Sequence, residues 1–143
     1  MTTIDDCQII QFPRISRPQG NITPVQGRIE LPFEIERVYY LYDIPGGANR
    51  GGHAHWNLQQ VIVSAMGSFS VEVDDGSKRK SIRLNRAYYG LYIPPMIWRE
   101  LIDFSSGGIC LVFASKPYQE ADYIRNYQSF IGQKAVVDAG PIS

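Results

Sequence analysis

The sequence predicts an all-β domain, a small barrel or sandwich of short strands with one helical segment near the C-terminus. Runs of six to ten residues rich in β-branched and aromatic side chains recur along the chain, as is typical of strands. Nine prolines and 13 glycines punctuate the chain closely enough for the turns of a sandwich or barrel. The length of 143 residues suits one domain, and neither an internal repeat nor a linker divides it.

Composition and turn signals place the individual strands. The third expected strand shows the alternation of a half-buried strand, because Phe69, Val71 and Val73 are separated by polar residues. The Asp75-Gly76 pair that follows predicts a hairpin turn into the fourth strand. In chain order, the expected strands are residues 35–44, 59–66, 68–76, 80–85, 88–95 and 109–115.

Helical periodicity is confined to the C-terminal region, residues 118–133. Apolar residues there recur at the spacing of one helix face. The last residues, 138–143, are expected to fray because chain ends are rarely held by the core. The residues of the expected face are Ala121, Ile124, Tyr127 and Phe130 or Ile131.

Charge and cysteine content argue against several classes of protein. Lysine plus arginine equals aspartate plus glutamate, at 14 each, so bulk charge does not favour a nucleic-acid or membrane-surface partner. No run approaches the roughly 20 apolar residues of a membrane span. The N-terminus has acidic residues where a signal peptide needs basic ones. Cys7 and Cys110 form no CxxC motif and are expected to be buried free thiols, so we expect a cytoplasmic protein.

The two histidines of the chain, His53 and His55, stand two positions apart in the stretch "NRGGHAHWNLQQV". On a strand, residues at this spacing project to the same face. Imidazole has an unperturbed pKa near neutrality, so a pair of histidines on one face beside a glycine-rich turn indicates acid–base chemistry.

This histidine stretch and the later "GLYIPPMIW" resemble the two motifs of the cupin barrel. Cupin metal sites take two histidines and a glutamate from the first motif and a histidine from the second. Here Gln59 and Gln60 stand near the place of the glutamate, and Arg99 replaces the second-motif histidine. Two imidazoles beside a guanidinium are a poor site for Zn, Fe or Mn, so no metal is expected.

A closer resemblance spans about residues 8–131 and is to the cupin-type dTDP-4-keto-6-deoxyglucose 3,4-ketoisomerases (WxcM-like). It is carried by "ERVYYLYD", "RGGHAH", "GSFSVEVDDG", "GLYIPPMIW" and "YQEADYIRNYQSF" in this order. The resemblance implies a jelly-roll barrel, a homodimer with exchanged N-terminal strands, a bound dTDP-sugar and no cofactor, in deoxyaminosugar biosynthesis for a surface glycan. We expect one cupin-like domain over 1–143, with its barrel core at about 8–116 and a C-terminal segment at about 117–143.

The reaction that this resemblance implies moves a ketone from C4 to C3 through an enediol. It is an internal redox exchange and needs no nicotinamide, and the chain has no GxGxxG fingerprint after a strand. It needs a base near the sugar and a donor for the developing enolate oxygen. We expect His53 to be the base, His55 to orient the sugar or shuttle a hydroxyl proton, and Tyr39 to be the hydroxyl donor.

The expected substrate-binding residues are mainly arginines and amides. Arg37 and Arg50 suit the diphosphate, because a guanidinium fork matches phosphate geometry. Arg99 is expected to bind a sugar oxygen or the diphosphate, and Gln60 and Gln19 complete the set. Many relatives have histidine in place of Arg99 and arginine in place of Gln19. Because arginine does not readily release a proton, we favour a gluco-configured product at C4.

Three other functions remain open from the sequence. Nucleotide-sugar 3,5-epimerases are related barrels that pair a catalytic histidine with an aspartate, and Asp43 is the aspartate nearest to "HAH" along the chain. A non-catalytic sugar-binding cupin module would need no base. A metal-dependent cupin oxygenase is disfavoured by the ligand count.

Overall fold

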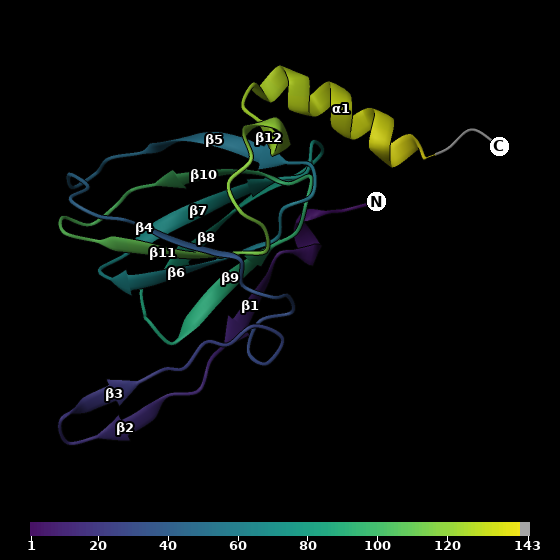
Figure 1. Ribbon diagram of the computed structural model, residues 1–143. Helices are drawn as coiled ribbons and strands as arrows, with labels where there is room; N and C mark the ends of the chain where they lie inside the picture. The colour runs from purple at the N-terminus through teal and green to yellow at the C-terminus, as the bar shows by residue number, and fades with distance from the viewer. Residues whose placement is uncertain (141–143) are drawn as a thin grey trace.

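The computed structural model describes residues 1–140, and its main body is two five-stranded antiparallel sheets that face each other (Figure 1). The first sheet has the strand order β1-β9-β6-β11-β4 and the second the order β12-β5-β10-β7-β8. The strands of the first sheet are β1 (Gln8–Gln11), β4 (Arg37–Leu41), β6 (Gln60–Met66), β9 (Tyr89–Ile93) and β11 (Ile109–Ala114). Those of the second are β5 (Arg50–His55), β7 (Phe69–Asp74), β8 (Arg79–Leu84), β10 (Trp98–Ile102) and β12 (Tyr123–Ile124).

Apolar side chains fill the space between the sheets around β7, β8 and β9. Phe69, Val71 and Val73 are fully buried, which confirms the alternation read from the sequence. Phe69 stacks on Phe104 with ring centroids 4.7 Å apart. Burial of one such side chain contributes about 1.5–3 kcal/mol, so this half of the sandwich contributes much of the stability of the fold. The other half, between β4 and β5, is hollow.

The six strands expected from the sequence are all present, with shorter bounds at several ends. The strand expected at 35–44 is β4 and stops at Leu41, before Pro45 and the glycines that follow. The Asp75-Gly76 turn is confirmed: the Asp75 side chain accepts a hydrogen bond from the Lys78 backbone N–H at 2.8 Å. Cys7 and Cys110 are both buried and free, as expected.

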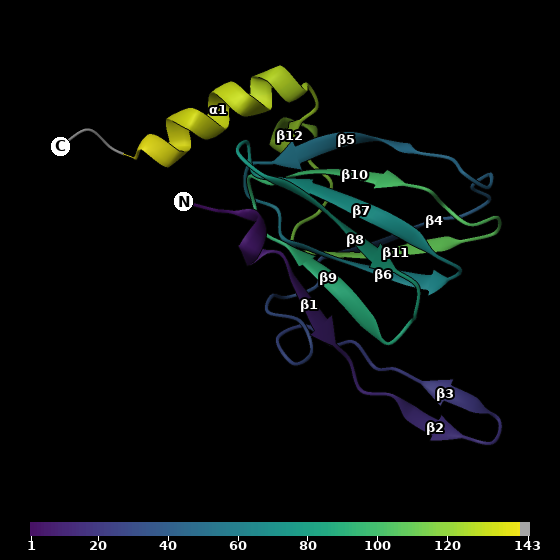
Figure 2. The same cartoon turned by 180° about the vertical axis from the view of Figure 1, so that it is seen from behind.

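The N-terminal region forms the edge strand of the first sheet and then leaves the barrel. A 3-10 helix, η1 (Ile4–Asp6), precedes β1, and a separate hairpin of β2 (Ile15–Arg17) and β3 (Gly20–Ile22) projects away from the barrel (Figures 1 and 2). Phe12 and Phe33, which flank this hairpin, pack on the outer face of the first sheet.

The C-terminal region differs from the expectation of one helix over residues 118–133. A 3-10 helix, η2 (Glu120–Asp122), comes first, β12 then pairs with β5, and α1 runs from Tyr127 to Ala139. The helix begins late because the Asn126 side chain caps it by accepting a hydrogen bond from the Ser129 N–H at 2.9 Å. The fraying expected for 138–143 does not occur at 138–139, which are helical, and residues 141–143 lie outside the described residues.

Helix α1 packs against the outer face of the second sheet (Figure 1). Its Phe130 is fully buried together with Ala54 and Trp98 of β5 and β10. The helix therefore anchors the segment before it across the end of β5. Within residues 1–140, no helix has the length and apolar character that a bilayer crossing requires.

Candidate active site

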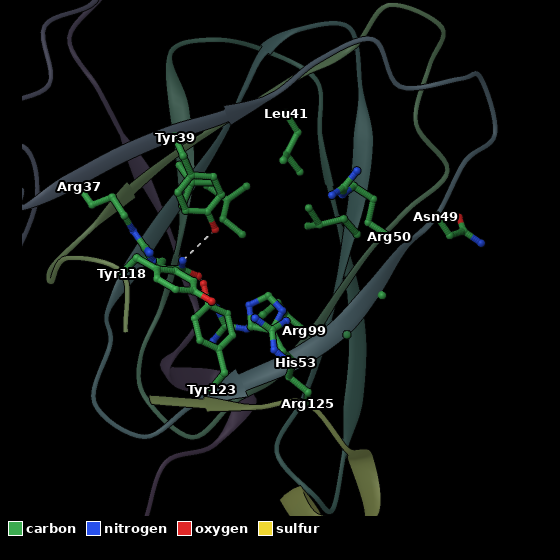
Figure 3. A pocket seen from close by; sticks show the side chains of 16 residues that line it. Arg37, Tyr39, Leu41, Asn49, Arg50, His53, Arg99, Tyr118, Tyr123 and Arg125 are labelled. Carbon is green, nitrogen blue, oxygen red and sulfur yellow. Dashed lines mark hydrogen bonds between the residues drawn. The ribbon is translucent and has the colours of Figure 1, made fainter. Parts of the chain in front are cut away.

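A cavity of about 830 Å³ opens between β4 of the first sheet and β5 of the second (Figure 3). Both sheets and the C-terminal segment contribute side chains to it. It brings together six of the residues singled out from the sequence. They are Arg37, Tyr39, Arg50, His53, Gln60 and Arg99.

His53 and His55 project to the same face of β5, as their spacing predicts. Their ring centroids are 4.8 Å apart and the rings are nearly perpendicular. His53 lines the cavity, whereas His55 is fully buried directly behind it. Gly52 is required before them, because a Cβ there would lie 2.6 Å from the indole of Trp98.

His55 has a carboxylate partner that the sequence did not indicate. Asp122 of η2 places Oδ2 at 3.2 Å from His55 Nδ1, and its Oδ1 accepts a hydrogen bond from the Asn57 backbone N–H at 2.8 Å. Asp43 is the aspartate nearest to these histidines along the chain, but the carboxylate that reaches His55 is that of Asp122, 67 residues away in sequence. The carboxylate favours the tautomer of His55 with its proton on Nδ1 and its lone pair on Nε2.

Both imidazoles are held in the neutral form. Burial lowers the pKa of His53 to about 3, and the positive charge of Arg99 acts in the same direction. Burial and Arg99 also lower the pKa of His55. The Nε2 atoms of both rings lack a hydrogen-bond partner among residues 1–140. At neutral pH the histidine wall (His53 at the cavity, with His55 and Asp122 behind it) therefore holds neutral imidazoles that can accept a proton.

The opposite wall of the cavity presents a phenol hydroxyl. Tyr39 of β4 accepts a hydrogen bond from Gln60 Nε2 of β6 at 3.0 Å (Figure 3). Burial raises the pKa of Tyr39, so its hydroxyl keeps its proton at neutral pH. We call Tyr39 and Gln60 the tyrosine wall.

Arg99 lies beneath both walls and is 2% exposed. It pairs with His53 in the β10–β5 register, and its Nη1 donates to Gln60 Oε1. Its Nε and Nη2 donate to the Ile97 carbonyl at 3.2 and 3.0 Å. Burial lowers the pKa of Arg99 to about 10, which still leaves it charged at neutral pH. In the described part of the chain no carboxylate forms an ion pair with Arg99, so its charge is available to an anion in the cavity.

The C-terminal segment supplies three cavity residues that sequence reasoning missed: Tyr118, Tyr123 and Arg125. The Tyr123 ring lies against both histidines, with centroid distances of 5.2 Å to His53 and 4.3 Å to His55. Arg125 lies over the Tyr123 ring. The stretch "DYIRNY" is part of the family resemblance, and Asp122, Tyr123 and Arg125 fall in it.

These residues do not fit the metal that the cupin fold can hold. Over residues 1–140 no group of three His, Cys, Asp or Glu side chains is placed to bind a metal ion. Gln60 stands near the place of the usual glutamate and is already engaged by Arg99. A buried guanidinium beside His53 would repel a cation placed there.

Comparison with known proteins decides the family. Residues 5–135 match a family model described as "FdtA: WxcM-like, C-terminal". The chain belongs to this family.

Three FdtA/WxcM-like relatives show how close the match is. The chain is 42% identical over 123 residues to the TDP-4-oxo-6-deoxy-alpha-D-glucose-3,4-oxoisomerase of Aneurinibacillus thermoaerophilus, covering 86% of this chain and 88% of that protein. A mutant of the 3,4-ketoisomerase QdtA from Thermoanaerobacterium thermosaccharolyticum, with asparagine for a histidine and TDP-4-keto-6-deoxyglucose bound, has a TM-score of 0.88 at 39% identity, covering 91% and 94%. The WlaRB TDP-quinovose 3,4-ketoisomerase of Campylobacter jejuni has a TM-score of 0.86 at 42% identity, covering 90% and 99%.

The remaining predicted residues of this FdtA/WxcM-like chain differ in where they lie. Arg37 and Arg50 line opposite sides of the cavity (Figure 3). Gln19 does not line this chain's cavity: it is exposed, at the turn of the β2–β3 hairpin that projects from the barrel. The single chain therefore does not bring Gln19 to the other predicted site residues.

Proposed function

We propose that this protein is a 3,4-ketoisomerase that converts dTDP-4-keto-6-deoxyglucose (dTDP and TDP being the same thymidine diphosphate) into a dTDP-3-keto-6-deoxyhexose. The observation that carries the proposal is a single cavity with neutral imidazole on one wall and a protonated phenol on the other. Movement of a ketone to the neighbouring carbon needs both, a base for a C–H proton and a donor for the oxygen that becomes negative. The relatives named above act on sugars of this type.

The proposed reaction begins when His53 removes the proton from C3. The electron pair of that bond forms the C3–C4 double bond, and the C4 carbonyl oxygen takes the Tyr39 proton to give an enediol. The buried charge of Arg99 stabilises the negative oxygen while it develops. The C3 hydroxyl then gives its proton to the Tyr39 phenolate and becomes the ketone, C4 takes a proton from a donor that exchanges with water, and His53 releases to water the proton that it took from C3. No atom or electron is gained or lost overall, so no external oxidant is needed.

Within this proposal His53 and His55 have different tasks. His53 lines the cavity and is the base. His55 is fully buried, and its Nδ1 is held by Asp122. With its Nε2 lone pair free, His55 keeps the neighbouring His53 ring oriented and can pass a hydroxyl proton. This division of tasks follows from the positions of the two rings, because His53 lines the cavity and His55 lies behind it.

The configuration at C4 depends on the face from which the enediol is protonated. Arg99 is charged and cannot easily give up a proton, so it holds a sugar oxygen without acting as the donor from its own position. A gluco-configured product, the configuration that quinovose has, requires C4 to receive its proton on the face opposite the one from which His53 removes the C3 proton, because H3 and H4 lie on opposite faces of a gluco ring. We assign this delivery to a donor that exchanges its proton with water.

The diphosphate is assigned to two arginines that line the cavity, Arg37 of β4 and Arg50 of β5. A guanidinium fork binds phosphate oxygens bidentately, so these residues can hold the nucleotide end while the sugar reaches His53. Arg125 adds a third positive charge, although its Nε and Nη2 already donate to Glu120 at 2.7 and 2.9 Å.

The isomerisation is proposed to proceed without a metal, because Arg99 and Gln60 stand where metal ligands would be. Exhaustive chelation followed by an isomerase assay checks this. We expect unchanged turnover. Turnover that chelation abolishes and one divalent ion restores would contradict the proposal.

The active form is proposed to be a homodimer with exchanged N-terminal strands. The β2–β3 hairpin exposes Ile15 and Ile22, and the outer side of β4 exposes Val38 and Tyr40. A second copy that covers these apolar side chains would remove them from water. In such a dimer the hairpin of one copy would lie over the other copy, and Gln19 would border the partner's cavity. Light scattering and a hairpin-deletion variant test this: a monomeric wild type would contradict it.

Conversion of the keto sugar is the test of the function itself. The protein is incubated with dTDP-4-keto-6-deoxyglucose and the product is followed by NMR. We expect a new carbonyl at C3 and loss of the carbonyl at C4. A 4-keto product inverted at C3 or C5 would indicate an epimerase, and binding without turnover would indicate a sugar-binding module.

A further inference from the structure

Arg99 forms the charged floor of the cavity. Among the described hydrogen bonds, Gln60 is the only residue that links Arg99 to Tyr39. It is 1% exposed, and both ends of its amide are engaged by protein. Because its side chain is almost fully buried and each end of the amide already bonds a protein side chain, Gln60 also acts on its two neighbours, beyond the substrate contact that was expected of it.

The donor and acceptor groups of Arg99, Gln60 and Tyr39 fix the direction of the two hydrogen bonds that join them. A guanidinium can only donate, so the Gln60 atom that faces Arg99 must be the carbonyl oxygen. The other end of the amide is therefore the NH₂ group, which can only donate as well. Tyr39 must accept that bond through its oxygen, so its own hydrogen points elsewhere.

No other protein acceptor for the Tyr39 hydroxyl occurs among the described residues, so its hydrogen is available to the cavity. Arg99 cannot turn to release the amide, because its Nε and Nη2 are fixed to the Ile97 carbonyl at 3.2 and 3.0 Å. We infer that Gln60 is a positioning residue: fixed by Arg99, it orients the Tyr39 hydroxyl so that its proton faces the substrate oxygen. This inference deepens the proposed function and rests on it.

The test is a double-mutant cycle between Gln60 and Tyr39. Gln60→Glu keeps the shape and can still accept from Arg99, but its second oxygen is an acceptor that draws the Tyr39 hydrogen away from the cavity. We expect kcat to fall about tenfold or more with little change in KM, the scale of a misdirected acid group. In the Tyr39→Phe background the same substitution should change kcat by less than about twofold, because coupled residues are not additive.

Gln59→Glu is the matched control. Gln59 also bonds a tyrosine, because its Oε1 accepts from the Tyr92 hydroxyl at 2.8 Å, but neither residue lines the cavity. This variant should keep the wild-type kcat. Equal losses from Gln60→Glu in both backgrounds would overturn the inference, since Gln60 would then act independently of Tyr39.

A second measurement does not depend on turnover or on the folding of Gln60→Glu. Tyrosine labelled with ¹³C at Cζ reports the pKa of Tyr39, assigned by its absence in Tyr39→Phe. Loss of the amide donor in Gln60→Met should raise the Tyr39 pKa, because the bond from Gln60 lowers it. An unchanged pKa would overturn the inference. If the wild type fails to isomerise the keto sugar, the proposed function fails, and this titration still decides the direction of the hydrogen bond.

Discussion

The histidine wall carries two neutral imidazoles backed by a carboxylate, whereas the tyrosine wall carries a protonated phenol backed by an amide and a guanidinium. Burial is the main cause of the pKa shift on both sides, but it acts in opposite directions on the two kinds of group. It favours the neutral form of each, which is the base form of an imidazole and the acid form of a phenol. Burial in one cavity therefore prepares an acceptor and a donor at the same pH.

Loss of the base should have the largest effect. His53→Asn and His55→Asn are each expected to lower kcat about 10²-fold or more, because asparagine keeps a polar side chain but accepts no proton. The measurement is steady-state turnover of dTDP-4-keto-6-deoxyglucose, with circular dichroism as the control for folding. Near-wild-type rates in both folded variants would mean that the histidine wall is structural.

Loss of the Tyr39 hydroxyl should have a smaller effect, because water or the histidine wall can supply the proton in its place, although less efficiently. Tyr39→Phe is expected to lower kcat about tenfold to hundredfold. Tyr92→Phe removes a hydroxyl outside the cavity and is the matched control. A Tyr39→Phe variant as active as this control would leave the tyrosine wall without a chemical role.

Exchange of the charged floor should change the product more than the rate. Arg99→His together with Gln19→Arg introduces the residues that the family resemblance indicates at these two positions, and a histidine in place of Arg99 can donate a proton. We expect a shift from the gluco toward the galacto epimer, read from the coupling pattern at H4 and H5. An unchanged product from an active double variant would show that stereocontrol lies elsewhere.

The smallest effect expected is on stability in acid. The histidine pKa is about 6.5 in an unfolded chain and about 3 for His53 in the folded protein. Between these values the unfolded state binds more protons, so the free energy of unfolding falls as the pH drops from 6.5 toward 3. His53→Asn should weaken this dependence in urea titrations at pH 7 and 4.5. A variant that loses as much stability as the wild type would contradict the shift.

Local patterns in the sequence predicted the residues that face the cavity better than the residues that hold them in place. The alternation at Phe69, Val71 and Val73 fixes a strand and its buried face, and the two-residue spacing of His53 and His55 fixes their common side. These are relations between neighbours along one strand. Together with the family resemblance they were enough to predict the barrel and six cavity residues.

Contacts between distant segments could not be predicted in this way. Asp122 follows His55 by 67 residues and meets it only because β12 pairs with β5. The periodicity of residues 118–133 indicated one helix. In the structure the helix begins only after its N-cap, Asn126, because β12 before it is paired with β5. Gln19 shows the converse case, since the resemblance assigned it to the pocket and the single chain holds it on a projecting hairpin.

The most direct test of the central claim is the fate of the C3 proton in D₂O. The wild type is incubated with dTDP-4-keto-6-deoxyglucose, and deuterium is located in the sugar ring by NMR, beside His53→Asn as the comparison. If the histidine wall removes the C3 proton, the wild type forms the 3-keto sugar with deuterium at C4, and His53→Asn gives neither. Deuterium at C5 with the carbonyl still at C4, or full incorporation by His53→Asn, would contradict the account.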